Sequence, residues 1–162
     1  MTPNGQHIIS GSLDNLLKVW SVASKSLVST CAGHTDFVFA VAAMPDGQRI
    51  LSGSRDKTVR VWLLNGTLEN TFELHTDSVR ALVALPDNQH ALSGSSDHTV
   101  KLFNVNDGAV LRTFKHHGSD RASGLPEWDA VNCLALLPDG LRFVSGSRDN
   151  TARITYHGLA AP

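Results

Sequence analysis

The sequence has no apolar run of the length needed to cross a bilayer, which is about 18–20 residues. Its first residues, Met1 to Gly5, lack the charged and then apolar segments of a secretory signal. Its two cysteines, Cys31 and Cys133, are too few for a disulfide framework, and both lie in predicted strands, where we expect them to be buried. These absences predict a cytoplasmic or otherwise intracellular protein that does not bind membranes.

An excess of one charge sign is lacking as well, because 14 basic residues stand against 15 acidic ones and the formal net charge is −1. Proteins whose main partner is nucleic acid usually carry a basic stripe, since they gain affinity by neutralising phosphates. The sequence has no such stripe, so we expect no nucleic-acid partner. Its 162 residues, 41% of them hydrophobic, are enough to bury the core of one domain.

What the sequence does contain is a repeated unit. The tripeptide Ser-Gly-Ser occurs four times, centred on Gly11, Gly53, Gly94 and Gly146. An aspartate follows each of these glycines by three residues, and a proline precedes each by eight. An aromatic residue follows the first three glycines by nine: Trp20, Trp62 and Phe103. Markers at fixed offsets indicate one structural unit used four times.

Each complete unit is predicted to form four short antiparallel strands. In the second unit these are residues 37–44, 48–54, 58–63 and a strand that follows the turn at Asn65-Gly66. No segment keeps a helical period, so the predicted fold class is all-β. A sheet of this kind must stack against similar sheets to bury both faces, and small first-strand residues such as Ala40 favour a β-propeller over a flat sandwich.

These motifs resemble the WD-repeat family, whose repeats carry Gly-His near their start and Trp-Asp near their end. Gly33-His34 and Leu74-His75 match the opening motif, the second without its glycine, and the closing dipeptide departs from the pattern throughout. The resemblance covers nearly the whole chain. It implies a WD-repeat β-propeller of about four blades that serves as a non-catalytic scaffold for protein–protein interaction, with no cofactor and no metal.

The repeats span approximately residues 1–32, 33–73, 74–115 and 127–162, with an inserted loop at 116–126. The resemblance implies a hydrogen-bond network in each blade, because a buried histidine needs a partner for each ring nitrogen. In the second repeat its members are His34, Asp56, Trp62 and a serine, either Ser52 or Ser54. The third repeat keeps His75, Asp97 and a serine, but Phe103 has no N–H to donate. The fourth has Glu127 and Thr155 at the outer positions of the network, which predicts a looser last blade.

His, Ser and Asp in proximity also suggest a hydrolase triad. A catalytic set is needed once, whereas this set recurs with the repeat, so we expect no enzyme. A second hypothesis, from a different class, is an enzyme-associated or catalytic propeller with a site in its central channel. It requires a unique cluster of titratable groups, and only repeated ones are found.

Four blades leave a propeller ring half open, and the successive repeats are predicted to hold three, four, four and three strands. Both end sheets would then expose an apolar face. Two accounts stay open: the chain is part of a longer propeller, or two copies form a homodimer that closes a ring of about eight blades. The sequence as written favours self-association.

The resemblance places partner sites on the face that carries the histidine and aspartate turns. Candidate binding residues on that face are Phe37, Arg55, Arg80 and Arg148. The arginines favour a phosphorylated, acidic or ubiquitin-like partner, and the alternative is that they are solvated loop charges. Trp128, next to the inserted loop, is either an anchor for a partner or a cover over the fourth blade.

Overall fold

The structure is a computed structural model that describes residues 1–115 and 130–159. In those residues the chain forms fourteen strands and no helix. The described residues therefore contain no helix that could span a bilayer. The predicted all-β class is confirmed. The inserted loop at 116–126, Glu127 and Trp128 lie outside the described residues.

The strands form four antiparallel sheets, which we call blades 1 to 4. Blade 1 contains β1 (His7–Gly11), β2 (Leu17–Ser21) and β3 (Leu27–Cys31). Blade 2 contains β4 (Val38–Ala43), β5 (Arg49–Ser54), β6 (Val59–Leu63) and β7 (Leu68–Phe72). Blade 3 contains β8 (Val79–Ala84), β9 (His90–Ser95), β10 (Val100–Asn104) and β11 (Val110–Phe114). Blade 4 contains β12 (Val131–Leu136), β13 (Arg142–Ser147) and β14 (Ala152–Tyr156).

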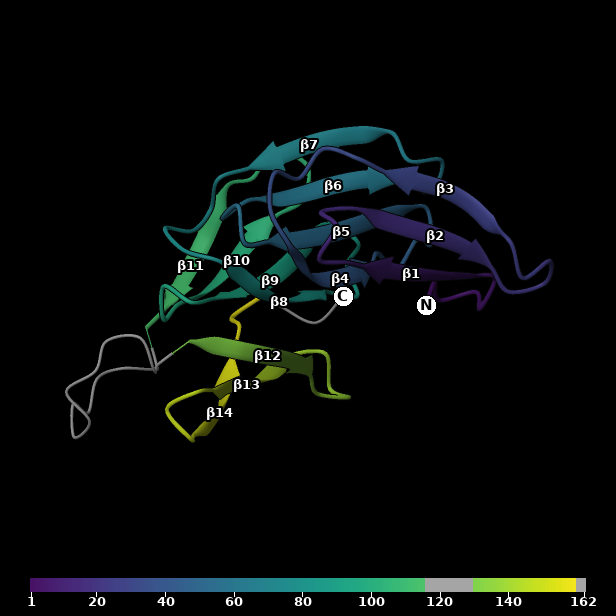
Figure 1. Cartoon of the computed structure of the whole chain (residues 1–162). Helices are drawn as coiled ribbons and strands as arrows, with labels where there is room; N and C mark the ends of the chain where they lie inside the picture. The colour runs from purple at the N-terminus through teal and green to yellow at the C-terminus, as the bar shows by residue number, and fades with distance from the viewer. Residues whose placement is uncertain (116–129, 160–162) are drawn as a thin grey trace.

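Within each blade the strands lie in chain order, from an inner to an outer strand. Figure 1 shows the blades following one another, with β1, β4 and β8 toward the middle and β3, β7 and β11 on the outside. Among the described residues, no strand pairs with the inner edge of β1 or with the outer edge of β14. The fold is therefore a partial propeller of about four blades, as the repeats predict.

The tight turn that follows the Ser-Gly-Ser strand is the same in every blade. Its aspartate accepts the backbone N–H two residues later, as Asp56 Oδ1 does from Thr58 at 3.0 Å. The residue between them has a positive φ, of 73° at Lys57 and 69° at His98. Few non-glycine residues adopt that conformation, so the side-chain hydrogen bond helps to hold it. The turn fixes the position of the aspartate and of the residues that flank it.

The first strands of blades 2, 3 and 4 each contain a β-bulge near their start. The pairing register shifts between Val38 and Ala40 in β4, and at the matching places in β8 and β12. The extra residues are Phe39, Arg80 and Asn132. A bulge interrupts the alternation of side chains between the two faces of a sheet. These three side chains therefore point in a different direction from the one that a regular strand would give them.

The core lies between successive blades, where three apolar clusters fill the three junctions. Each cluster contains one fully buried aromatic residue: Trp62, Phe103 or Phe143. Cys31 belongs to the first cluster, whereas Cys133 is exposed, so the prediction of burial was wrong for Cys133. The reason is that none of the described residues forms a blade against its side of blade 4.

Candidate functional site

A closed hydrogen-bond network lies inside blade 2. His34 Nδ1 is 2.7 Å from Asp56 Oδ2, and His34 Nε2 is 2.7 Å from Ser52 Oγ. Trp62 Nε1 donates to the same serine oxygen at 2.8 Å. A carboxylate can only accept, so Nδ1 carries the proton of the neutral ring and Nε2 accepts from the Ser52 hydroxyl. Within this network, both ring nitrogens of His34, the Ser52 hydroxyl, the Asp56 carboxylate and the Trp62 N–H each have a hydrogen-bond partner.

The network holds its acid ionised and its histidine neutral. Burial lowers the pKa of His34, although the Asp56 carboxylate opposes that shift. Burial works against ionisation of Asp56, but hydrogen bonds from Thr58, His34 and the backbone lower its pKa to about 2. A neutral imidazole between a carboxylate and a hydroxyl is a stable arrangement that needs no proton transfer.

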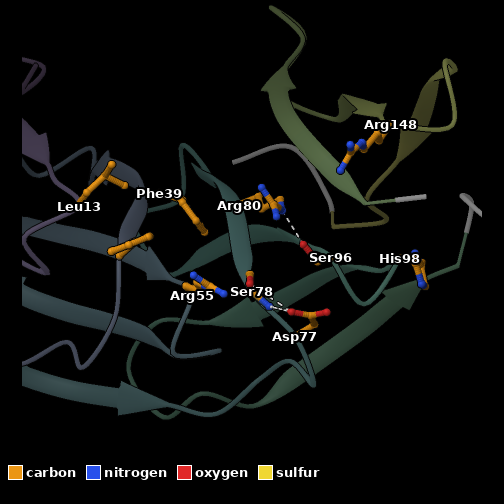
Figure 2. A pocket seen from close by; sticks show the side chains of 10 residues that line it. Leu13, Phe39, Arg55, Asp77, Ser78, Arg80, Ser96, His98 and Arg148 are labelled. Atoms are coloured by element: carbon orange, nitrogen blue, oxygen red, sulfur yellow. Dashed lines mark hydrogen bonds between the residues drawn. The ribbon is translucent and has the colours of Figure 1, made fainter. Parts of the chain in front are cut away.

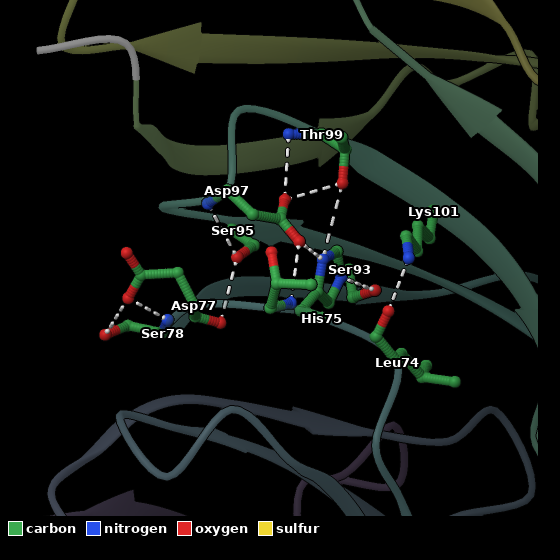
Figure 3. Close-up of polar contacts among 10 residues, drawn as sticks. Leu74, His75, Asp77, Ser78, Ser93, Ser95, Asp97, Thr99 and Lys101 are labelled. Atoms are coloured by element: carbon green, nitrogen blue, oxygen red, sulfur yellow. Dashed lines mark hydrogen bonds and ion pairs between the residues drawn. The ribbon is translucent and has the colours of Figure 1, made fainter. Parts of the chain in front are cut away.

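Blade 3 repeats the network without the indole, as Figure 3 shows around His75. His75 Nδ1 is 2.7 Å from Asp97 Oδ2, and His75 Nε2 is 2.8 Å from Ser93 Oγ. Phe103 fills the tryptophan position, is fully buried and gives no N–H. Despite burial, hydrogen bonds from His75 and Thr99 lower the pKa of Asp97.

The structure distinguishes the two serines of each Ser-Gly-Ser. Ser52 faces the histidine, while Ser54 Oγ donates to the Asp36 carbonyl at 3.0 Å and accepts the Asp56 N–H. Ser54 therefore holds the turn and not the ring. Sequence reasoning missed the threonine of this turn: Thr58 Oγ1 donates to Asp56 Oδ1 at 2.7 Å. The recurrence of Asp-x-Thr at 56–58, 97–99 and 149–151 was the available signal.

These networks do not form a hydrolytic site. Ser52 and Ser93 are fully buried, so neither oxygen can reach a substrate. The same set occurs in two blades, and in blade 2 its serine also accepts the indole N–H. In the part of the chain that the structure describes, no group of three or more His, Cys, Asp or Glu residues could hold a metal ion.

A pocket of about 600 Å³ opens on the face that carries the aspartate turns (Figure 2). It brings together all the described residues that the sequence named as binding candidates, although they come from three blades. Its lining residues are Leu13, Phe37, Phe39, Arg55, Asp77, Ser78, Arg80, Ser96, His98 and Arg148. Two of the bulge residues, Phe39 and Arg80, are among them, and Arg80 was a binding candidate from its position in the repeat.

Arg80 is held in place by two neighbours. Its Nε donates to Ser96 Oγ, and its guanidinium lies over the Phe39 ring at 5.1 Å from the centroid. Among the described residues, its terminal nitrogens Nη1 and Nη2 make no hydrogen bond. A guanidinium whose Nε is engaged presents its two terminal nitrogens together, which suits a carboxylate or phosphate.

Arg55 is positioned in a similar way. Its guanidinium lies over the Phe37 ring at 5.6 Å, and its Nε is 3.7 Å from Asp36 Oδ2. The rings of Phe37 and Phe39 meet edge to face at 6.3 Å between centroids, so the two cation–aromatic pairs adjoin one another. Asp77 is the one acid among the described lining residues, and its Oδ1 accepts hydrogen bonds from the N–H and the hydroxyl of Ser78.

Arg148 contributes from blade 4, where its backbone N–H donates to the Ala130 carbonyl at 3.0 Å. Figure 2 shows its side chain beyond Arg80, on the side of the pocket opposite Leu13. Among the described residues, the pocket lining therefore contains three guanidinium groups and one carboxylate. Its charge favours an anionic ligand.

A family model described as "WD domain, G-beta repeat" matches the chain four times, over residues 1–21, 25–62, 66–104 and 108–155. The last three matches each run from the outer strand of one blade through the third strand of the next. The sequence repeat is thus offset by one strand from the blade. Together the matches take in most of the chain.

Proposed function

The chain belongs to the WD-repeat family, and on that basis we propose that its arginine-lined pocket binds an acidic or phosphorylated segment of a partner protein. Members of the family generally act as non-catalytic scaffolds that bind other proteins. The proposal adds a site and a ligand chemistry to that general role. It rests on the part of the face where Arg55, Arg80 and Arg148 meet.

The observation that carries the proposal is the geometry of Arg55 and Arg80. Each guanidinium lies over a phenylalanine ring, and its terminal nitrogens make no hydrogen bond to the described residues. Arg80 Nε is hydrogen-bonded to Ser96 Oγ, and Arg55 Nε makes a longer ion-pair contact of 3.7 Å with Asp36 Oδ2. Fixing a long side chain in advance reduces the conformational entropy lost on binding. Two guanidinium groups in one pocket can each donate a pair of hydrogen bonds to carboxylate or phosphate oxygens.

The test measures the affinity of the chain for three fluorescent decapeptides. They carry Glu, phosphoserine or Gln at the same alternate positions. We expect the two anionic peptides to bind and the Gln peptide not to bind. Replacing both Arg55 and Arg80 by Gln removes hydrogen bonds to charged groups, each worth about 1.5–3 kcal/mol. The affinity should therefore fall at least about tenfold, and binding should weaken as salt rises.

The control variant is Lys115→Gln, which removes an exposed cation that does not line the pocket. It should leave the peptide affinity nearly unchanged. Equal affinities of the control and the double variant would refute the proposal. A preference for the phosphoserine peptide over the Glu peptide would identify the partner as phosphorylated.

A second candidate role is self-association through the end blades, as the sequence predicts. The observation in its favour is that apolar side chains are exposed at both ends, with Ile8 48% exposed in blade 1 and Ile154 64% exposed in blade 4. Light scattering after size exclusion measures the solution mass directly. A stable monomer would count against a homodimer. The intracellular location predicted from the sequence is checked by imaging a fluorescent fusion.

A further inference from the structure

Three positions beside the tight turns carry a large apolar residue in one blade and polar or small residues in others. The residue directly before the turn aspartate is Leu13 in blade 1, but arginine or serine in blades 2 to 4. The bulge residue is Phe39 in blade 2, but Arg80 in blade 3 and Asn132 in blade 4. The residue before the bulged strand is Phe37 in blade 2, but serine or alanine in blades 3 and 4.

The backbone around these positions is the same in blades 2, 3 and 4. In blade 2 the N–H of Arg55, which precedes the turn aspartate, donates to the carbonyl of Phe37 at 2.8 Å. The matching pairs, at 2.9 and 3.0 Å, are Ser96 with Ser78 and Arg148 with Ala130. The connection forms equally well with serine or alanine, so the fold does not require a large apolar side chain there.

All three apolar residues line the arginine-lined pocket. Figure 2 shows Leu13, Phe39 and Arg80 in succession, with Arg148 beyond Arg80. Leu13 is 64% exposed and Phe39 is 38% exposed, so both side chains are open to a ligand. The pocket therefore has an apolar end, formed by Leu13 and Phe39, and a cationic end, formed by Arg80 and Arg148.

On the basis of the function proposed above, we propose that the bound partner segment carries an apolar side chain near its acidic or phosphorylated residue. Leu13 and Phe39 bind this apolar side chain while the arginines bind the anion. Phe39 and Arg80 belong to adjacent blades, and stacked sheets lie about 10 Å apart, a distance that an extended chain covers in about three residues. The apolar residue should therefore lie within about four positions of the anionic one.

The two ends of the pocket are coupled through Phe39. Its ring lies under the Arg80 guanidinium, with 5.1 Å between Cζ and the ring centroid. An apolar side chain seated on Leu13 and Phe39 would exclude water from this pair, and cation–aromatic contacts strengthen when they lose water. A single exposed leucine is common on protein surfaces and indicates no binding by itself. Here it adjoins an exposed aromatic ring that supports an anion-binding arginine, which argues for one ligand across both ends.

The test measures the affinity of the chain for a series of fluorescent peptides by anisotropy. Each peptide carries a pair of phosphoserines at fixed positions, and one leucine is placed in turn at each of the four positions before and after the pair. The reference peptide has serine in place of the leucine. We expect at least one leucine position to raise the affinity about fivefold, as partial burial of a leucine side chain should.

The variant that identifies the apolar end is Leu13→Ser, which gives blade 1 the residue that blade 3 carries at the same position, Ser96. It should remove the gain of the leucine peptide and leave the affinity for the reference peptide unchanged. Unchanged binding of the reference peptide also shows that the variant is folded. The matched control is Leu111→Ser, because Leu111 is a leucine of β11 that is 47% exposed and does not line the pocket. The gain should persist in this control.

Two results would overturn the assignment of the apolar end and leave the proposed function intact. One is binding of the reference peptide with no gain at any leucine position. The other is a gain that survives in Leu13→Ser, because the leucine would then bind elsewhere. Failure of the reference peptide and of every leucine peptide to bind would overturn both the proposed function and the apolar end.

Discussion

The serine at the centre of the buried network should matter more in blade 2 than in blade 3. In blade 2, Ser52→Ala leaves two buried groups without a partner, His34 Nε2 and the Trp62 N–H. In blade 3, Ser93→Ala leaves only His75 Nε2, because Phe103 has no N–H. An unsatisfied buried polar group costs about 1–3 kcal/mol. Ser52→Ala should therefore lower the free energy of unfolding by about 1–3 kcal/mol more than Ser93→Ala.

Urea denaturation followed by circular dichroism measures both losses under one set of conditions. Trp62→Phe is the control, since it gives blade 2 the aromatic residue that blade 3 carries naturally. In that background, Ser52→Ala should cost about as much as Ser93→Ala, and the double-mutant cycle isolates the indole–hydroxyl coupling. Equal losses for the two serines in the original chain, or a coupling near zero, would refute the assignment of the indole N–H to the network.

Three further predictions concern pH, packing and local stability. The pKa of Asp56 is lowered to about 2 from an ordinary 3.8, so its stabilising contribution is fully present above the ordinary pKa and is lost as the pH falls toward 2. The lowered pKa of His34 acts in the same direction below its ordinary 6.5, and Asp56→Asn should make the urea midpoint fall less on acidification. Gly53→Ala places a methyl group 2.6 Å from Val79 Cγ1 and should lower the free energy of unfolding by about 1–3 kcal/mol. The double variant that adds Val79→Ala should recover part of this loss. No recovery would argue against the packing of Val79 on Gly53. The amides of β13 should exchange with deuterium faster than those of β9, because one side of blade 4 is not covered by any described blade; equal exchange would contradict a looser last blade.

The fold was predictable because its signals are local and repeated. The offsets between proline, Ser-Gly-Ser, aspartate and aromatic residue in the sequence mark turns and strands whose geometry depends on neighbours a few residues away. Four copies of one unit also predict that the sheets must stack, since no single sheet can bury both faces. The strand count of each blade followed from the same markers.

Other features were decided only by the tertiary structure, because they depend on side chains far apart in the chain. Which serine faces His34 depends on the pleat of β5, since alternate residues point to opposite faces. The stacking of Arg80 on Phe39 joins the bulges of two blades, and the bulges follow from strand register and not from residue type. The exposure of Cys133 likewise depends on whether a neighbouring blade covers it, and the residues around it in the sequence carry no signal of that.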